Sequence, residues 1–229
     1  MGRRSSTYYD SKRIVYNTVK QLANDYSIES PEVGIYEDSE PNAFATGSSK
    51  NNSLVAVSSG LLDAMTHDEI EWVIAHEMAH ILNGDMLTMA LIQWVLNTFV
   101  IFASRVLANV ADKYFSDGES KGPWFIYYGV SIVLDMLFGF LASLIAMRFS
   151  RYREYRADAD SAYYVGKEKM IAGLQRLKSM QDAMHTTPKD QMAVFKIGSK
   201  KRGGIMKYFS THPDLDDRIK VLQEMDVTD

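Results

Sequence analysis

The segment Asp68–Asn83, DEIEWVIAHEMAHILN, contains the pattern H-E-x-x-H at residues 76–80. Residues four apart on an α-helix share a face, so the imidazoles of His76 and His80 can point at one place. Glu77 lies one step round the helix, beside that place. Two neutral imidazoles and a carboxylate suit zinc, and a catalytic zinc site keeps a further position for water. The alternative is a pair of surface histidines on an amphipathic helix.

The residues before this segment predict where its helix begins. Thr66 and Glu69 have the spacing of a capping box, which places the helix start about ten residues before His76. The candidate ligands therefore lie well inside a helix. His67 lies at the cap and is expected on the surface.

Three short segments with strand-like composition precede the helix: Glu32–Glu37, Asn42–Gly47 and Ser53–Val57. They predict a small sheet. An edge strand of such a sheet could bind an extended peptide through its main chain. An ordinary sheet with nothing bound is equally compatible, because the sequence does not tell which strand is outermost.

Length and composition narrow the possible classes of protein. The chain has 229 residues, 46% of them hydrophobic, which allows one large domain or a domain with an insertion. The net charge of -4 gives no case for nucleic acid as a partner. There is no cysteine, so a metal site must use histidine and carboxylate. The N-terminus, MGRRSSTYYD, has no apolar stretch typical of a signal peptide.

Two long apolar runs, Met86–Ser104 and Pro123–Met147, follow the H-E-x-x-H segment. Each is close to the length that crosses a bilayer, and the polar segment Ala111–Gly122 separates them as a predicted loop. The runs therefore predict a transmembrane hairpin. The alternative is a pair of buried helices in a soluble protein, which the polar side chains of Gln93 and Asn97 would suit.

Charged residues orient this hairpin. Arginines cluster directly after the second run, at positions 148, 151, 153 and 156. The positive-inside rule places that end, and with it the H-E-x-x-H helix, in the cytoplasm. Asp135 is costly in lipid and is expected to face a partner helix, a cavity or an interface.

Beyond the hairpin, Arg151–Val165 predicts a helix on which Glu154 and Asp158 share a face. A glutamate here, after the H-E-x-x-H helix, can supply the third zinc ligand. Asp158 can then accept a hydrogen bond from the other ring N–H of a ligand histidine. The alternative is a solvated helix whose carboxylates pair with its arginines.

A last helix is predicted over Asp214–Met225, and His212 stands just before the proline that begins it. Arg218 lies six residues after His212. Loop histidines are usually solvated, so this pair carries little weight without further support.

The motifs HEMAH, EYRAD and STHPDLDDRI, in this order with an apolar hairpin between the first two, resemble the HtpX family of membrane zinc metalloproteases, relatives of the CAAX prenyl proteases. The match extends through NAFATG, SLVAVSSGLL, NGDMLTMALIQ and GKEKMIAGLQRLK. The resemblance implies an α+β, mostly helical, zincin-like (gluzincin) fold with a small sheet and an inserted hydrophobic hairpin. Family members begin with two more transmembrane helices, which are missing from this sequence.

The resemblance also implies a role for each matching residue. His76, His80 and Glu154 would bind one Zn²⁺ per chain, Glu77 would be the catalytic base, and Asp158 would support a ligand. His212 and Arg218 would act on the substrate carbonyl or stabilise the site. The substrate backbone would be held by Asn42, Ala43 and Phe44.

The expected activity is that of a bacterial inner-membrane, multi-pass endopeptidase with its site on the cytoplasmic side, which cleaves damaged or misfolded membrane proteins in stress response. Its partners would be membrane-protein or unfolded-polypeptide substrates and the lipid bilayer, without nucleic acid. The predicted parts are 1–85 (N-terminal helix, sheet and H-E-x-x-H helix), 86–147 (hairpin) and 148–229 (third-ligand and C-terminal helices). Two alternatives remain: a prenyl-protein processing protease, and a membrane-associated binding or scaffold protein with a structural zinc.

Overall fold

The computed structural model describes residues 2–115, 124–186 and 213–225. It divides the chain into two compact units. The first contains Met1–Leu87 together with Arg151–Asp229, and the second contains Thr88–Ser150. Each unit is described separately below.

The sheet of the first unit has three strands: β1 (Glu32–Tyr36), β2 (Ala43–Ser49) and β3 (Asn52–Ser58). Their order is β1-β3-β2, with β3 parallel to β1 and antiparallel to β2. The strand β3 is central and mostly buried, whereas β2 lies at an edge and is alternately half-buried and exposed. The predicted small sheet is confirmed, and the structure shows that β1 and β2 are its two edge strands.

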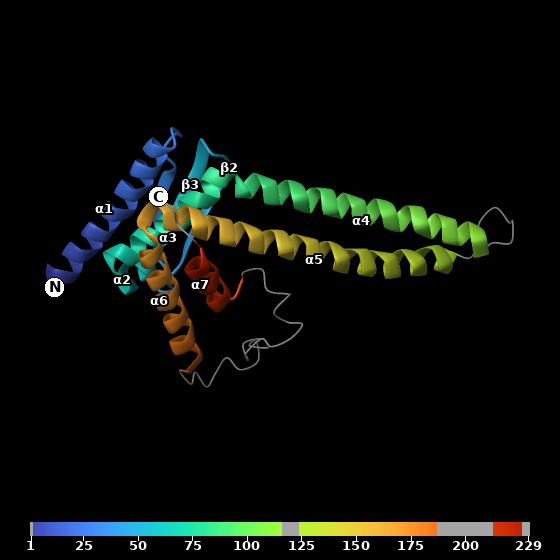
Figure 1. The fold of residues 1–229 in the computed structure, drawn as a ribbon. Helices are drawn as coiled ribbons and strands as arrows, with labels where there is room; N and C mark the ends of the chain where they lie inside the picture. The colour runs from blue at the N-terminus through green and yellow to red at the C-terminus, as the bar shows by residue number, and fades with distance from the viewer. Residues whose placement is uncertain (1, 116–123, 187–212, 226–229) are drawn as a thin grey trace. The chain divides into compact units, whose positions relative to one another are not determined.

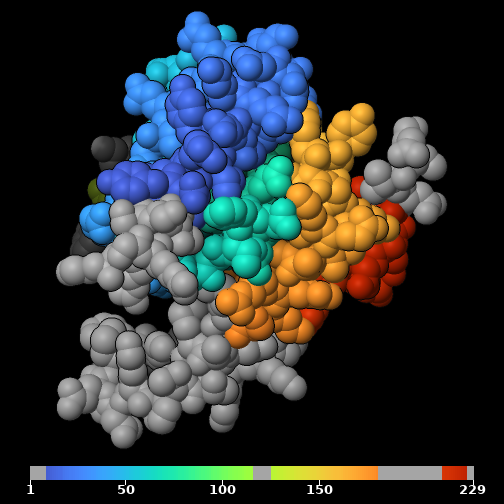
Figure 2. Space-filling view, turned by 90° about the vertical axis from the view of Figure 1, so that its left-hand side faces the viewer, coloured from blue at the N-terminus to red at the C-terminus, as the bar shows by residue number. Residues whose placement is uncertain are grey.

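The helix α3 (His67–Asn83) lies at the centre of the hydrophobic core. It begins with the predicted capping box between Thr66 and Glu69, and His67 is exposed at this end. The helix α1 (Gly2–Asp25) packs beside it, and α2 (Ser59–Ala64) packs against α1 and β3. Figure 2 shows residues of α2 and α3, in teal, between α1 in blue and later helices in orange. The largest fully buried side chains of this core include Ile70, Ile74, Met78, Ile81, Met170, Leu174 and Leu222.

Two further helices complete the first unit: α6 (Lys167–Thr186) and α7 (Leu215–Glu224). The helix α6 packs against both α3 and α7. It approaches α3 closely at Gly173, where a Cβ atom would lie 1.8 Å from Nε1 of Trp72. This contact requires glycine, because any side chain at position 173 would overlap the indole.

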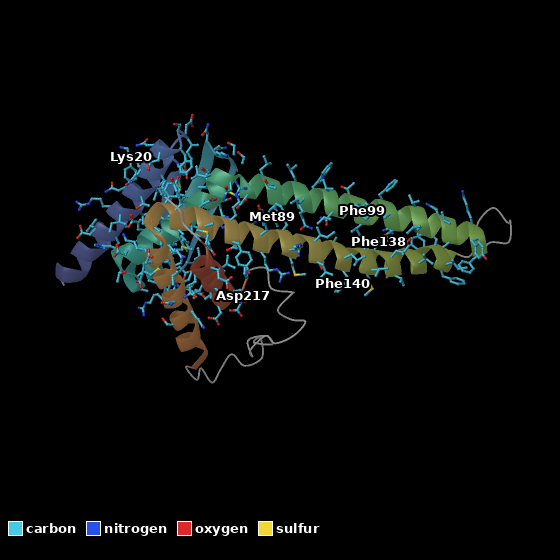
Figure 3. All side chains as sticks on the ribbon, in the orientation of Figure 1. Lys20, Met89, Phe99, Phe138, Phe140 and Asp217 are labelled. Atoms are coloured by element: carbon cyan, nitrogen blue, oxygen red, sulfur yellow. The ribbon has the colours of Figure 1, made fainter. Side chains whose placement is uncertain are left out.

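The second unit is an antiparallel pair of helices from α4 (Asp85–Phe115) and α5 (Trp124–Val165), which run side by side (Figure 1). Both helices are long and apolar enough to cross a membrane. The rings of Phe99 and Phe138, labelled in Figure 3, lie 6.3 Å apart between them. The helix α4 continues to Phe115, so the first residues of the predicted loop at Ala111–Gly122 are helical. Polar residues do not by themselves end a helix, because their side chains can remain in water while the backbone stays helical.

Large apolar side chains cover the outside of this helix pair. Trp94 is 68% exposed and Phe102 is 67% exposed. Asp135 is paired within the hairpin, because its Oδ2 lies 3.1 Å from Nη1 of Arg105. Monomeric soluble proteins rarely expose so large an apolar surface, so this unit needs an apolar environment or a partner.

Candidate metal centre

Three potential ligands from two helices converge in the first unit. His76 and His80 stand one turn apart on α3, with their rings edge to face and 4.8 Å between centroids. Glu154, on α5, places its carboxylate 3.5 Å from Nε2 of His76 and 3.7 Å from Nε2 of His80. One ligand atom from each of the three residues lies within 4.8 Å of the other two. The three residues could therefore hold one metal ion.

Asp158 supports His76 from behind. Its Oδ1 lies 3.0 Å from Nδ1 of His76, and both side chains are buried. Arg218, on α7, binds the same carboxylate with two hydrogen bonds: Nε donates to Oδ2 over 2.7 Å and Nη2 donates to Oδ1 over 2.5 Å. Nη1 of Arg218 also lies 3.5 Å from Oε2 of Glu154. Arg218 thus offsets the negative charge of two buried acids.

His80 has a corresponding partner in Asp85, which the sequence analysis did not identify. Oδ2 of Asp85 lies 2.6 Å from Nδ1 of His80, and Asp85 is buried. Gly84 makes this possible, because it ends α3 in the left-handed conformation, with φ 67°, and turns the chain back toward the ligand. An acid directly after a glycine at the end of a ligand-bearing helix is a signal that could have indicated this contact.

The donor set suits zinc in its chemistry. The contacts with Asp158 and Asp85 occupy Nδ1 of each histidine and leave both Nε2 atoms facing Glu154. Two imidazole nitrogens and one carboxylate are a known catalytic zinc set, in which a fourth position stays open. Carboxylates behind ligand histidines are also usual in zinc sites, because they fix the tautomer.

Burial and charge shift the pKa values in this cluster. Burial lowers the pKa of His76, but the carboxylates of Asp158 and Glu154 outweigh it and raise the pKa to about 9. Burial raises the pKa of Asp158, but the hydrogen bonds from Arg218 and the contact with His76 bring it below its usual value. The acids around His76 therefore attract a positive charge to this point.

Glu77 lies beside the three ligands and faces the sheet. Its Oε2 accepts a hydrogen bond of 2.9 Å from the backbone N–H of Ala45 on β2. Burial raises the pKa of Glu77, although His76 and His80 act in the opposite direction. A carboxylate with a raised pKa beside a metal position is suited to accept and return a proton.

The ligands line a cleft of about 450 Å³ in the first unit. Asn42, Ala43 and Phe44, predicted to hold a substrate backbone, also line it, and Phe44 is 42% exposed. Arg218 also lines this cleft, in addition to its contacts with Asp158 and Glu154. His212, the other predicted catalytic residue, lies outside the described residues.

The chain is similar in sequence to known peptidases. The model of peptidase family M48 matches residues 11–226. The chain is 56% identical to Protease HtpX of Pasteurella multocida over 217 residues, 95% of this chain and 74% of that protein. It is 51% identical to Protease HtpX of Histophilus somni over 217 residues, 95% of this chain and 73% of that protein.

One solved structure extends the comparison to the fold. The crystal structure of S. mikatae Ste24p superposes with a TM-score of 0.62, at 18% identity, over 91% of this chain and 49% of that chain. The chain thus spans about half the length of Ste24p. At this identity the likeness concerns the fold alone, and it confirms the predicted zincin-like α+β class with a small sheet and an apolar helix pair.

Proposed function

The chain belongs to peptidase family M48, with the proteases named HtpX among its relatives, and from this we propose that it is a zinc-dependent endopeptidase of the H-E-x-x-H…E type. The observation that carries the proposal is the convergence of His76, His80 and Glu154, with Glu77 beside them in an open cleft. A structural zinc is usually closed by four protein ligands, and three cluster among the described residues. This difference supports catalysis over the scaffold alternative.

The site residues have distinct tasks in peptide hydrolysis. Zinc, when bound, supplies a Lewis acid that polarises the scissile carbonyl and makes water more acidic. Glu77 accepts the proton of the attacking water at its carboxylate and returns it to the leaving amine nitrogen. Asp158 and Asp85 hold the imidazoles in one orientation, and Arg218 keeps Asp158 ionised. We propose that the edge strand β2 binds the substrate main chain through Ala43 and Phe44, together with Asn42, which directly precedes the strand.

The proposed location is a bacterial inner membrane. The helices α4 and α5 are long and apolar enough to cross it, and their apolar side chains are exposed. The arginines that follow the second apolar run favour the cytoplasm for the end that continues to Glu154. Damaged or misfolded membrane proteins are the proposed substrates, on the strength of the family resemblance.

The test combines metal analysis with peptide hydrolysis. We expect one zinc per purified chain, and hydrolysis that a chelator abolishes and added zinc restores. Glu77→Gln should keep zinc and lower the hydrolysis rate by about 10²- to 10⁴-fold, the usual contribution of general acid–base catalysis. Glu71→Gln is the matched control, because Glu71 lies on the same helix but binds Lys169 on the surface. Chelator-resistant hydrolysis, or a Glu77→Gln rate equal to that of the parent, would refute the proposal.

A further inference from the structure

The catalytic cleft contains two arginines, and only one of them has an acid partner. Arg218 is paired with the carboxylates of Asp158 and Glu154. Arg153, which directly precedes Glu154 on α5, also lines the cleft but forms no ion pair with any described carboxylate. The positive charge of Arg153 is therefore not offset by an acid in the described part of the chain.

The other contacts of the Arg153 guanidinium are weak. Its Nε is shielded from solvent and has no hydrogen-bond partner among the described residues. Its Nη1 donates to the backbone oxygen of Asp85 over 3.5 Å, which is long for a hydrogen bond. A half-buried guanidinium has lost part of its hydration, and a charge that loses water without gaining a partner is unfavourable. An anion that enters the cleft would supply the missing partner.

The contact with Asp85 also shows where in the cleft Arg153 lies. Gly84 ends the helix α3, and Asp85 follows it directly. The Arg153 side chain, which reaches the backbone oxygen of Asp85, is therefore near the end of α3. His80 and Met86, from the last turn of α3 and the residues after it, line the cleft as well.

The direction of β2 decides which part of a bound peptide meets Arg153. Ala45 on β2 contacts Glu77 in the middle of α3. After the end of β2, Cε of Lys50 lies beside the end of α3, 4.0 Å from where a Cβ of Gly84 would be. The strand β2 and the helix α3 thus run in the same direction.

A peptide that joins the free edge of β2 is expected to pair antiparallel, the slightly more stable arrangement per residue. Such a peptide runs opposite to β2 and therefore opposite to α3. Its residues on the N-terminal side of the scissile bond then lie toward the end of α3, where Arg153 lines the cleft.

We propose that Arg153 is a specificity-determining residue that binds an aspartate or glutamate side chain of the substrate on the N-terminal side of the scissile bond. The inference rests on the proposed endopeptidase function. Arg153 is next to the candidate ligand Glu154, and an extended chain advances about 3.3 Å per residue. The bound acid is therefore expected at the first or second residue before the scissile bond.

The chemistry of the guanidinium favours a carboxylate over the other groups of a peptide. Hydrogen bonds between arginine and a carboxylate are assisted by charge, can form in parallel pairs, and are roughly twice as strong as neutral ones. A glutamine in the same place offers a single neutral acceptor. A lysine there would bring a second positive charge toward Arg153, which is unfavourable.

Two peptide series test this preference in the zinc-loaded protein. The peptides share one sequence and carry glutamate, glutamine or lysine, at the first residue before the cleavage site in one series and at the second in the other. We expect kcat/KM for glutamate to exceed that for lysine by about tenfold or more in one of the series, as for other charged hydrogen bonds. Equal values in both series, or a preference for lysine in both, would overturn the proposal.

Reversal of the charge makes the test specific to Arg153. Arg153→Glu should invert the ratio of kcat/KM between the glutamate and lysine peptides, and Arg153→Met should bring it close to one. Arg156→Glu is the matched control, because Arg156 lies three residues later on the same helix, is paired with Asp160 at the surface and does not line the cleft. The control should keep the ratio of the parent protein. An unchanged ratio in folded, zinc-loaded Arg153→Met would overturn the proposal.

These outcomes separate the role of Arg153 from the enzyme activity. If the zinc-loaded protein cleaves no peptide, or cleaves them equally well after Glu77→Gln, the proposed function fails. If cleavage depends on zinc and Glu77 but shows no charge preference, or a preference that survives Arg153→Met, this inference alone fails. Circular dichroism and metal analysis check the fold and zinc content of each variant. If Arg153→Glu does not fold, Arg153→Met and the two peptide series decide the question.

Discussion

At the scale of single residues, each candidate metal ligand is held in place by a second side chain. Each histidine has its Nδ1 against a buried carboxylate, Asp158 for His76 and Asp85 for His80. Arg218 in turn binds Asp158 and lies close to Glu154. These contacts hold each imidazole ring in one orientation, with Nε2 toward Glu154.

Asp85→Ala should weaken zinc binding without removing a ligand. Loss of such a carboxylate behind a ligand histidine typically costs about 10- to 100-fold in metal affinity. Competition with a chromogenic zinc chelator measures the change. Asp63→Ala is the control, because Asp63 is exposed and does not line the catalytic cleft. Equal affinities in the two variants would show that Asp85 does not support His80.

Arg218→Met should destabilise the fold even when no metal is present. It leaves the buried carboxylate of Asp158 without its cation, which costs about 3–5 kcal/mol for a typical buried pair. Urea denaturation of chelator-treated protein in detergent measures the free energy of unfolding. The double variant Arg218→Met with Asp158→Leu should recover part of the loss, since it removes the uncompensated charge. A single variant as stable as the parent would contradict the ion pair.

At the scale of elements, α3 links the core to the site. One face of this helix contributes Ile70, Ile74 and Ile81 to the core, and its other face presents the two histidines. The close approach of α6 at Gly173 keeps Leu177, one turn later, at the cleft. Packing of α6 on α3 therefore shapes the cleft, which Trp72 and Leu177 both line.

Gly173→Ala should separate these helices. The added methyl would overlap the indole of Trp72, and overpacking of this kind typically costs about 1–3 kcal/mol. Thermal unfolding followed by circular dichroism should show a lower Tm. Ala172→Val, at the exposed neighbouring position, adds more volume but should cost only a few tenths of a kcal/mol in helix propensity. A Tm equal to that of the control would show that the helices adjust without cost.

At the scale of the whole molecule, one chain contains a unit with a hydrophobic core and a unit whose apolar side chains face outward. The segment Thr88–Ser150 interrupts the first unit in sequence, so the H-E-x-x-H helix and the Glu154 helix lie on opposite sides of the insertion along the chain. If the insertion crosses the bilayer twice, both ends return to one side. This arrangement is compatible with a site built from both flanks.

Introduced cysteines can test that topology, because the chain contains none of its own. Tyr114→Cys, near the end of α4, should react with a membrane-impermeant maleimide on intact spheroplasts. Asp63→Cys, in the unit with the site, should react only after the inner membrane is permeabilised. Mass shift on a gel reports both reactions. Labelling of both positions from the same side would exclude a spanning hairpin.

The sequence by itself determined the site helix, its capping box and the two long apolar runs. These features depend on spacing within one element, and helical periodicity converts spacing directly into shared faces. The resemblance to HtpX proteases added the zincin-like fold and the residue roles.

Only the tertiary structure decided which strands lie at the edges of the sheet, that Glu154 lies beside the two histidines, that Asp85 supports His80, and that Arg218 binds Asp158. Each of these depends on contacts between elements far apart in the chain, such as Arg218 with Asp158 or Ala45 with Glu77. Local periodicity carries no information about such contacts, because they arise from how whole helices and strands pack.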